Sequence, residues 1–402
     1  MRDHQFSSPI TYFFLMLPVG ISSGFVAVTL PFIFTRAGIP VATTAAVVAI
    51  GNSAYVWRFL WAPLADLSMS THAWYLIGIV GASATLLLVD TLPPHPGALL
   101  TGLVFFSQVT ASMIMLPIGG MIAHTVVDAK KGSASGWYQA GNLGGSGIGG
   151  GVGVWLATHS SSGTVGSALA AAMLACAAAL YFVPNVKAVP GEKLRLRIRG
   201  FGQDFRDLIR THRALLVMVL VFSPIGVGGA SQLWSAVAPD WHVTPDTVAL
   251  VTGVLAGVVS AIGCVVGGLL CDRIGRFWVF FGAGGVLAGI AIVMAALPRT
   301  PHIYSVGVLA YALAMGAAYG AYTALIFYAI GKGAASAKYA IFASFGSAPV
   351  TYMTAFDGWA HDRWGAAGML HGEALLGLAC IVLGLVALWS VNRLGGIKAT
   401  AG

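Results

Sequence analysis

Two charged motifs lie at equivalent points of the two halves of this 402-residue chain. The second reads Gly-x-Leu-x-Asp272-Arg273-x-Gly-Arg276, and in the first half Arg58 and Asp66 enclose Phe-Leu-Trp-Ala-Pro-Leu-Ala. A carboxylate in such a turn can pair with an arginine or face a helix N-terminus. Contacts of this kind that break and reform would gate a conformational change. We therefore predict that these five residues gate the protein; the alternative is ordinary basic loop composition on one side of a membrane.

A second set of candidates consists of polar and aromatic residues inside apolar runs, where such residues are costly and often functional. Together they could line a central cavity that binds a solute through hydrogen bonds and aromatic faces. Singly, each is as readily an interhelical hydrogen bond or an aromatic residue at the membrane interface. The predicted substrate-binding set is Asn52, Tyr55, Gln108, Gln139, Asn142, Gln232, Trp234, Tyr319 and Tyr322.

One apolar run, residues 134–157, carries glycines at every fourth position: Gly141, Gly145, Gly149 and Gly153. Small residues at this spacing let helix backbones approach closely in lipid, so we predict a helix-packing ridge. The same stretch contains G-x-G-x-x-G, but a dinucleotide site would need a preceding strand and a βαβ unit. Close packing is therefore the favoured interpretation.

The composition indicates that most of the surface of this chain lies in lipid and not in water. Hydrophobic residues make up 57% of the chain and charged residues 8%, whereas soluble domains carry about 25% charged residues. Twelve continuous apolar runs are long enough to span a bilayer as helices. They cover about residues 10–34, 43–61, 73–91, 97–123, 134–157, 165–183, 214–238, 247–270, 277–297, 303–331, 339–358 and 368–391. We predict an all-α membrane protein with twelve transmembrane helices.

The distribution of basic residues predicts the orientation and the domain boundaries. Seventeen Lys and Arg residues fall on the side that holds both termini and three on the other, with Arg58 at the end of a span. This bias places both termini in the cytoplasm. The predicted domains are a six-helix bundle over 1–183, a basic linker over 184–213 and a second bundle over 214–402. The net charge of +8 then reflects membrane orientation, and we expect lipid as partner rather than nucleic acid.

The halves also resemble each other, and the resemblance extends to a known family. Pro31 precedes Asp66 by 35 positions and Pro239 precedes Asp272 by 33. The motif at 268–276 is similar to the signature loop of the major facilitator superfamily, whose fold has two related six-helix bundles. Residues 30–66 depart from that loop by lacking an Arg after Asp66. They resemble the peptide/acetyl-CoA transporter branch, which includes muropeptide permeases and siderophore importers.

This resemblance implies a secondary active transporter that works by alternating access and is driven by protons. We predict a monomeric permease and symporter of the bacterial inner membrane that imports a bulky polar small molecule, such as a siderophore or muropeptide. Asp357 is the proposed proton-coupling residue, and the alternative is a solvated charge in an outer loop. His371 and Glu373 lie at the start of the last span. The alternative function is an efflux carrier for drugs or metabolites, against which the absence of Pro from 134–157 counts.

Enzyme motifs are missing from the sequence. It has no nucleophile elbow, no Walker-type phosphate loop and no paired His or Cys spacing typical of a metal site. We therefore expect a protein that is not an enzyme and needs neither a cofactor nor a metal.

Overall fold

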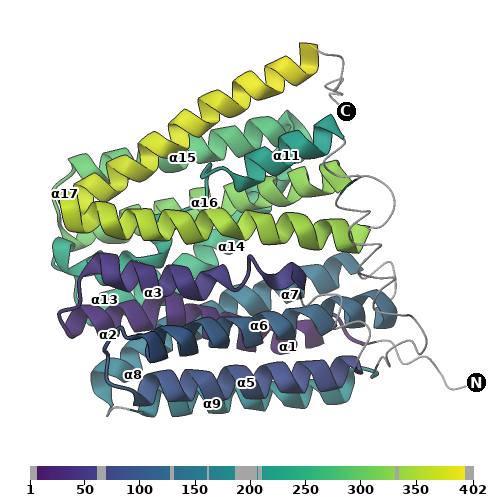
Figure 1. Cartoon of the computed structure of the whole chain (residues 1–402), viewed down its shortest axis with the longest axis vertical. Helices are drawn as coiled ribbons and strands as arrows, with labels where there is room; N and C mark the ends of the chain where they lie inside the picture. The colour runs from purple at the N-terminus through teal and green to yellow at the C-terminus, as the bar shows by residue number, and fades with distance from the viewer. Residues whose placement is uncertain are drawn as a thin grey trace, which may run out of the picture. The chain divides into compact units, whose positions relative to one another are not determined.

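The computed structural model describes residues 7–60, 69–126, 131–160, 163–185, 206, 211–330 and 335–393, and within these ranges every regular element is helical (Figure 1). Eight segments are long and apolar enough to cross a membrane: Thr11–Arg36, Thr71–Thr91, Ala98–Gly119, Thr164–Phe182, Pro245–Cys271, Arg276–Ala296, Pro301–Ile326 and Ile341–Val391. The all-helical prediction is confirmed. Most of these segments match a predicted span closely, because uninterrupted apolar runs leave the backbone no other way to satisfy its hydrogen bonds in lipid.

The last of these segments contains two predicted spans. Helix α17 (Ala335–Arg393) turns sharply at Gly365, whose φ of 69° and ψ of −175° are not helical. Glycine is the residue that adopts such a conformation without steric cost. Figure 1 shows the two arms of α17 meeting at the labelled turn and diverging from it.

Two predicted spans differ from the observed helices. The span predicted over 43–61 is helical as α3 (Val41–Ser53), turns over 54–57 and is helical again at 58–60. The span predicted over 214–238 is interrupted after α11 (His212–Phe222) and resumes only as the short helices η5 (Gly229–Gln232), α12 (Trp234–Val237) and η6 (Ala238–Trp241). The reason is local: Pro224 lacks an N–H, and Gly226 and Gly228 have positive φ angles of 67° and 71°. A hydropathy profile does not detect interruptions of a helix within an apolar run.

The chain forms two compact units. Unit 1 comprises Met1–Ile39, Ile50–Leu194 and Thr244–Gly257, and unit 2 comprises Pro40–Ala49, Arg195–Val243 and Val258–Gly402. Each unit thus includes one short segment from the other half of the sequence. Most of the predicted linker over 184–213 lies outside the described residues.

In unit 1, a helix that runs continuously through α1 (Thr11–Gly24), η1 (Phe25–Thr29) and α2 (Leu30–Arg36) packs against α7 (Lys131–Gly147), η3 (Ile148–Val152) and α8 (Gly153–His159). The four glycines of the ridge face this helix. A side-chain carbon at Gly141, Gly145 or Gly149 would collide with the carbonyl oxygens of Phe13, Leu17 or Ile21, and one at Gly153 with Thr29 Oγ1. Helices α5 (Thr71–Thr91), α6 (Ala98–Thr125), α9 (Thr164–Cys176) and η4 (Ala177–Phe182) complete the unit together with α13 (Pro245–Thr247) and η7 (Val248–Leu255).

Unit 2 packs α11, α15 (Arg276–Ala296), α16 (Pro301–Ile330) and α17 around an apolar core that includes Leu220, Phe281, Leu325 and Phe342. Most of α14 (Ala256–Ile274) also belongs to it. The short helices η5 to η6 lie between α11 and α14 in sequence. The chain segment that follows the break after α11 therefore lies against both arms of α17.

Candidate functional site

The most unusual chemistry in the described part of the chain is a pair of buried carboxyl groups in unit 2. Asp357 lies on the first arm of α17 and is 0% exposed, and Glu373 lies on the second arm and is 4% exposed. Each is eight residues from Gly365, so the two antiparallel arms carry them at the same level, about 12 Å from the turn at 1.5 Å per residue. The two groups are close enough to interact electrostatically.

The two carboxyls have different hydrogen-bond environments. The Tyr311 hydroxyl on α16 donates to Glu373 Oε1 at 2.6 Å, and the backbone N–H groups of Gly229 and Ala230 lie beside the same carboxyl. Among the described residues, both buried oxygens of Asp357 have no hydrogen-bond partner, and neither does Glu373 Oε2. Within the described residues neither carboxyl forms an ion pair. A bare carboxylate in such a place is strongly disfavoured unless it is neutralised.

The broken helix provides the space for this pair. A side-chain carbon at Gly229 would collide with Asp357 Oδ2 and lie 2.8 Å from Met353 Cβ. At Gly228, whose φ is positive, it would lie 2.6 Å from Met315 Sδ and 3.2 Å from the Tyr311 ring. Two glycines in succession therefore allow the backbone of η5 to reach the carboxyls, and only glycine fits this approach.

Aromatic side chains surround Tyr311 on the side of the short helices. Trp234 packs edge-on against Tyr311, Tyr304 and Trp241 with ring centroids 5.3, 6.3 and 6.4 Å apart. The Tyr304 hydroxyl donates to the Trp234 carbonyl oxygen at 2.8 Å. Trp234, predicted to bind substrate, is therefore fully enclosed by this cluster, and its neighbour Gln232 is partly exposed in η5.

A second ionisable cluster lies one turn from Asp357 along the first arm. His361 Nε2 is 2.7 Å from Asp240 Oδ2 on η6, and its Nδ1 is 3.5 Å from Asp362 Oδ1. The Asp240 side chain is 30% exposed. This contact ties the end of the short helices to α17.

In unit 1, three of the predicted substrate-binding residues gather around the middle of α6. The Tyr55 hydroxyl lies 3.1 Å from Gln108 Oε1 and 3.0 Å from Ser23 Oγ. The buried Gln108 amide donates to Ser22 Oγ at 2.9 Å. Asn52 is partly exposed three residues before Tyr55 in sequence. Tyr55 thus connects α1, α6 and the turn after α3, and can present a hydroxyl group beside the amide.

The other predicted substrate-binding residues are less closely associated. Gln139 and Asn142 are partly exposed on α7, and the Asn142 carbonyl faces Gly20 of α1. Tyr319 and Tyr322 stack on α16 with centroids 5.5 Å apart, and Tyr319 is exposed. Gln139 and Asn142 thus belong to unit 1, and Tyr319 and Tyr322 belong to unit 2.

The predicted gating residues are described only in part. Arg58 is partly buried, with its guanidinium 3.7 Å from Met115 Sδ and close enough to Tyr55 to interact electrostatically. Arg273 is exposed in the last turn of α14, and Arg276 begins α15 with its guanidinium 4.3 Å from the Tyr328 ring centroid. Gly275, with φ of 90°, makes the turn between these helices. Asp66 lies outside the described residues, and for Asp272 only the helical backbone is described.

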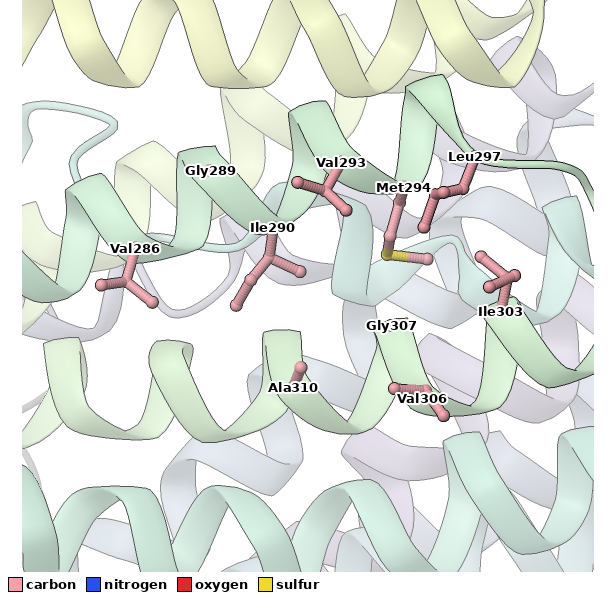
Figure 2. A pocket seen from close by; sticks show the side chains of 10 residues that line it. All are labelled: Val286, Gly289, Ile290, Val293, Met294, Leu297, Ile303, Val306, Gly307 and Ala310. Carbon is pink, nitrogen blue, oxygen red and sulfur yellow. The ribbon is translucent and has the colours of Figure 1, made fainter.

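An apolar cavity of about 390 Å³ lies between α15 and α16 (Figure 2). Figure 2 shows Val286, Ile290 and Met294 on α15 opposite Ile303 and Ala310 on α16. Its lining has no ionisable or hydrogen-bonding side chain, so it offers nothing to recognise a polar solute. Nor do the described residues contain three or more His, Cys, Asp or Glu side chains grouped to hold a metal ion.

Comparisons with known proteins identify the family. The model of the Major Facilitator Superfamily matches residues 12–352. The chain belongs to the major facilitator superfamily. It is therefore an integral, multi-pass membrane protein that transports a solute, and it is not an enzyme. No curated protein matches the sequence significantly.

Solved structures share the fold of this superfamily member at low sequence identity. A POT family transporter in complex with 5-aminolevulinic acid aligns with a TM-score of 0.75 and 12% identity over 96% of each chain. The nucleoside transporter NupG aligns with a TM-score of 0.69 and 11% identity, over 94% of this chain and 98% of its own. Tetrameric PepTSo2 aligns with a TM-score of 0.68 and 16% identity, over 96% and 98%. The predicted fold class is confirmed.

Sequence reasoning did not include Glu373 and Tyr311 in the site. Both lie in apolar runs where a polar group is costly, and that cost was the available signal. The predicted outer loop over 359–367 placed Asp357 and Glu373 near the membrane surface. In the structure both arms are helical up to the turn, so both residues are inside the helices. The interpretation of Asp357 as a solvated loop charge is wrong for this reason.

Proposed function

We propose that the protein is a proton-coupled importer of a bulky polar solute in the bacterial inner membrane, with both termini in the cytoplasm. The observation that carries this proposal is the fully buried Asp357 carboxyl, for which the described part of the chain provides no hydrogen-bond partner. A solute carrier driven by protons needs a group that gains and loses a proton as access alternates, and an intramembrane carboxyl meets this need.

Two further features support the class of cargo. The first is the resemblance of residues 30–66 to the branch that includes muropeptide permeases and siderophore importers. The second is the cluster of Tyr55 and Gln108 with Arg58 nearby, which offers a hydroxyl, an amide and a positive charge to a polar, anionic solute. Structural neighbours include transporters in complex with 5-aminolevulinic acid and with a thioalcohol-conjugated peptide. We propose a siderophore or a peptide-containing cell-wall fragment as cargo.

The experiment is solute uptake by the full chain in proteoliposomes. The probes are a radiolabelled anionic ferric siderophore and a radiolabelled muropeptide, each with an imposed proton gradient, acidic outside. We expect accumulation of one probe above its external concentration, and its loss when a protonophore is added. Absence of flux for both probes under every imposed gradient would contradict the proposal. Increased drug sensitivity of a deletion strain without a nutrient defect would favour efflux instead.

A further inference from the structure

We propose that Asp357 and Glu373 form one two-carboxyl site that binds a single proton, held on Asp357 while Glu373 carries the negative charge. The existence of the site is independent of its use, and only its role in transport rests on the proposed function. The ligand is a proton, and the elements that respond to it are the two arms of α17 and the short helix η5.

The assignment of the proton follows from the hydrogen-bond donors. Glu373 accepts from the Tyr311 hydroxyl and lies beside two backbone N–H groups, and donors of this kind stabilise a carboxylate. Asp357 is 0% exposed and receives no hydrogen bond at either oxygen from the residues that the structure describes, so this environment stabilises its neutral, protonated form. Two carboxylates side by side in a buried site cannot both be ionised without strong repulsion.

In the part of the chain that the structure describes, no ion pair offsets the charge of these two carboxyls. On α16 the titratable group facing the pair is Tyr311, which acts as a hydrogen-bond donor. The residues of η5 and of the α3 segment Val41–Ala49, which packs against Gly358 beside Asp357, contain no ionisable side chain. Along α17, His361 and Asp362 lie one turn from Asp357, and His361 is hydrogen-bonded to Asp240. On the second arm, His371 lies two residues from Glu373 and is exposed.

The proton step is balanced within the site. In the loaded state Asp357 is a carboxylic acid and Glu373 a carboxylate, with one negative charge in total. Breaking the Asp357 O–H bond, once a conformational change exposes the site, delivers the proton to water and leaves two carboxylates. Their repulsion acts between the two arms of α17 and against the backbone of η5 at Gly229, whose missing side chain lets Asp357 lie directly against it. Proton release is thereby linked to movement of the broken helix.

Infrared difference spectroscopy of the full-length, lipid-reconstituted protein tests the site without any cargo. On alkalinisation we expect the wild type to lose one carboxylic-acid C=O band, and this band to shift in D₂O. The band should be absent from Asp357→Asn and retained in Glu373→Gln, because only Asp357 carries the proton. In Gly229→Ala it should shift, since the added carbon displaces the carboxyl. The matched control is Asp246→Asn, an exposed carboxylate, which should leave the band unchanged.

Several outcomes would overturn the assignment. They are a wild type without the band, an Asp357→Asn variant that keeps it, or loss of the band on adding sodium at constant pH, which would indicate a metal-cation site. Gly229→Ala keeps the proposal testable if Asp357→Asn fails to fold, because an unshifted band in that variant also contradicts it.

Transport measurements separate this inference from the proposed function. Asp357→Asn should abolish proton-driven accumulation of the transported probe, while exchange of labelled for unlabelled probe continues, since exchange needs no net proton movement. If the wild type accumulates the probe with protons and Asp357→Asn does so equally, the inference is wrong although the function stands. If the wild type moves neither probe but the infrared result is as expected, the proposed function is wrong and the proton site stands.

Discussion

At the scale of single residues, a few atoms determine the chemistry of unit 2. One hydroxyl, that of Tyr311, is the described side-chain donor to the Glu373 carboxyl. One missing side chain, at Gly229, leaves the space occupied by Asp357 Oδ2. Because buried polar groups are costly without partners, both features affect stability as well as proton binding.

The first prediction concerns the Tyr311 hydroxyl. Tyr311→Phe removes the donor and keeps the ring against Trp234, so the Glu373 carboxylate loses a charge-assisted hydrogen bond. We expect the free energy of unfolding to fall by about 1–3 kcal/mol, measured by denaturant-induced unfolding in detergent micelles. The exposed Tyr181 provides the control, and Tyr181→Phe should leave stability unchanged. Equal stability of Tyr311→Phe and the wild type would show that the hydrogen bond contributes nothing.

At the scale of helices, the glycine ridge of α7 and its continuation determines how unit 1 packs. Gly141, Gly145 and Gly149 of the ridge meet backbone carbonyl oxygens of α1, so these contacts are between backbones and cannot be relieved by rotating a side chain. In lipid, helices are held together by dispersion forces between closely packed backbones and not by the hydrophobic effect. The same helix presents Gly147 and Gly151 to residues 253–254 of η7, so two of its faces are committed to backbone packing.

The second prediction tests this ridge with the smallest possible change. Gly145→Ala places a methyl group against the Leu17 carbonyl oxygen and Gly20, and overpacking of this kind costs about 1–3 kcal/mol. We expect a lower unfolding temperature and a lower yield of monodisperse protein. Gly102→Ala on α6 is the matched control, because a side-chain carbon there meets nothing within 4 Å. A ridge variant as stable as the control would refute the packing role.

At the scale of the whole molecule, each compact unit includes a short segment from the other half of the sequence. In unit 2, Gly358 lies against Val41, Ala42 and Ala45 of α3, directly beside Asp357. In unit 1, Gly253 lies against Gly150 and Gly151. If alternating access requires these contacts to form and separate, their glycines control the rate of transport rather than the binding of cargo.

The third prediction is therefore a kinetic one. Gly358→Val should prevent the start of α3 from packing on α17 and lower the rate of probe uptake about 10-fold or more, which corresponds to ~1.4 kcal/mol in a barrier. Gly285→Val on α15, where nothing lies within 4 Å, should transport normally. Uptake by Gly358→Val at the wild-type rate would mean that this contact is not remade during the cycle.

The fourth prediction concerns orientation. Reporter enzymes that are active only in the cytoplasm or only in the periplasm, fused to each terminus, should place both ends in the cytoplasm, as the distribution of basic residues predicts. A fusion at the turn between α5 and α6, after Thr91, should report the opposite side. Ends on opposite faces would contradict the predicted pairing of two six-helix bundles.

The sequence by itself indicated that the protein lies in a membrane, and it determined the class of fold and much of the helix packing. Long apolar runs with few charges leave helices as the only continuous solution in lipid, and a four-residue glycine spacing necessarily lies on one face of a helix. The charged turn at 268–276 indicated the superfamily through its residues alone. None of these inferences depends on which residues far apart in sequence come into contact.

The tertiary structure alone decided the carboxyl site. Asp357 and Glu373 meet because Gly365 folds α17 back on itself with equal numbers of residues in each arm, and because the break after Phe222 brings Gly229 against them. Periodicity and hydropathy describe one segment at a time, so they place a carboxyl along its helix but not among its neighbours. Whether a buried acid is a solvated charge or a proton site depends on those neighbours, and they are contributed by three separate helices.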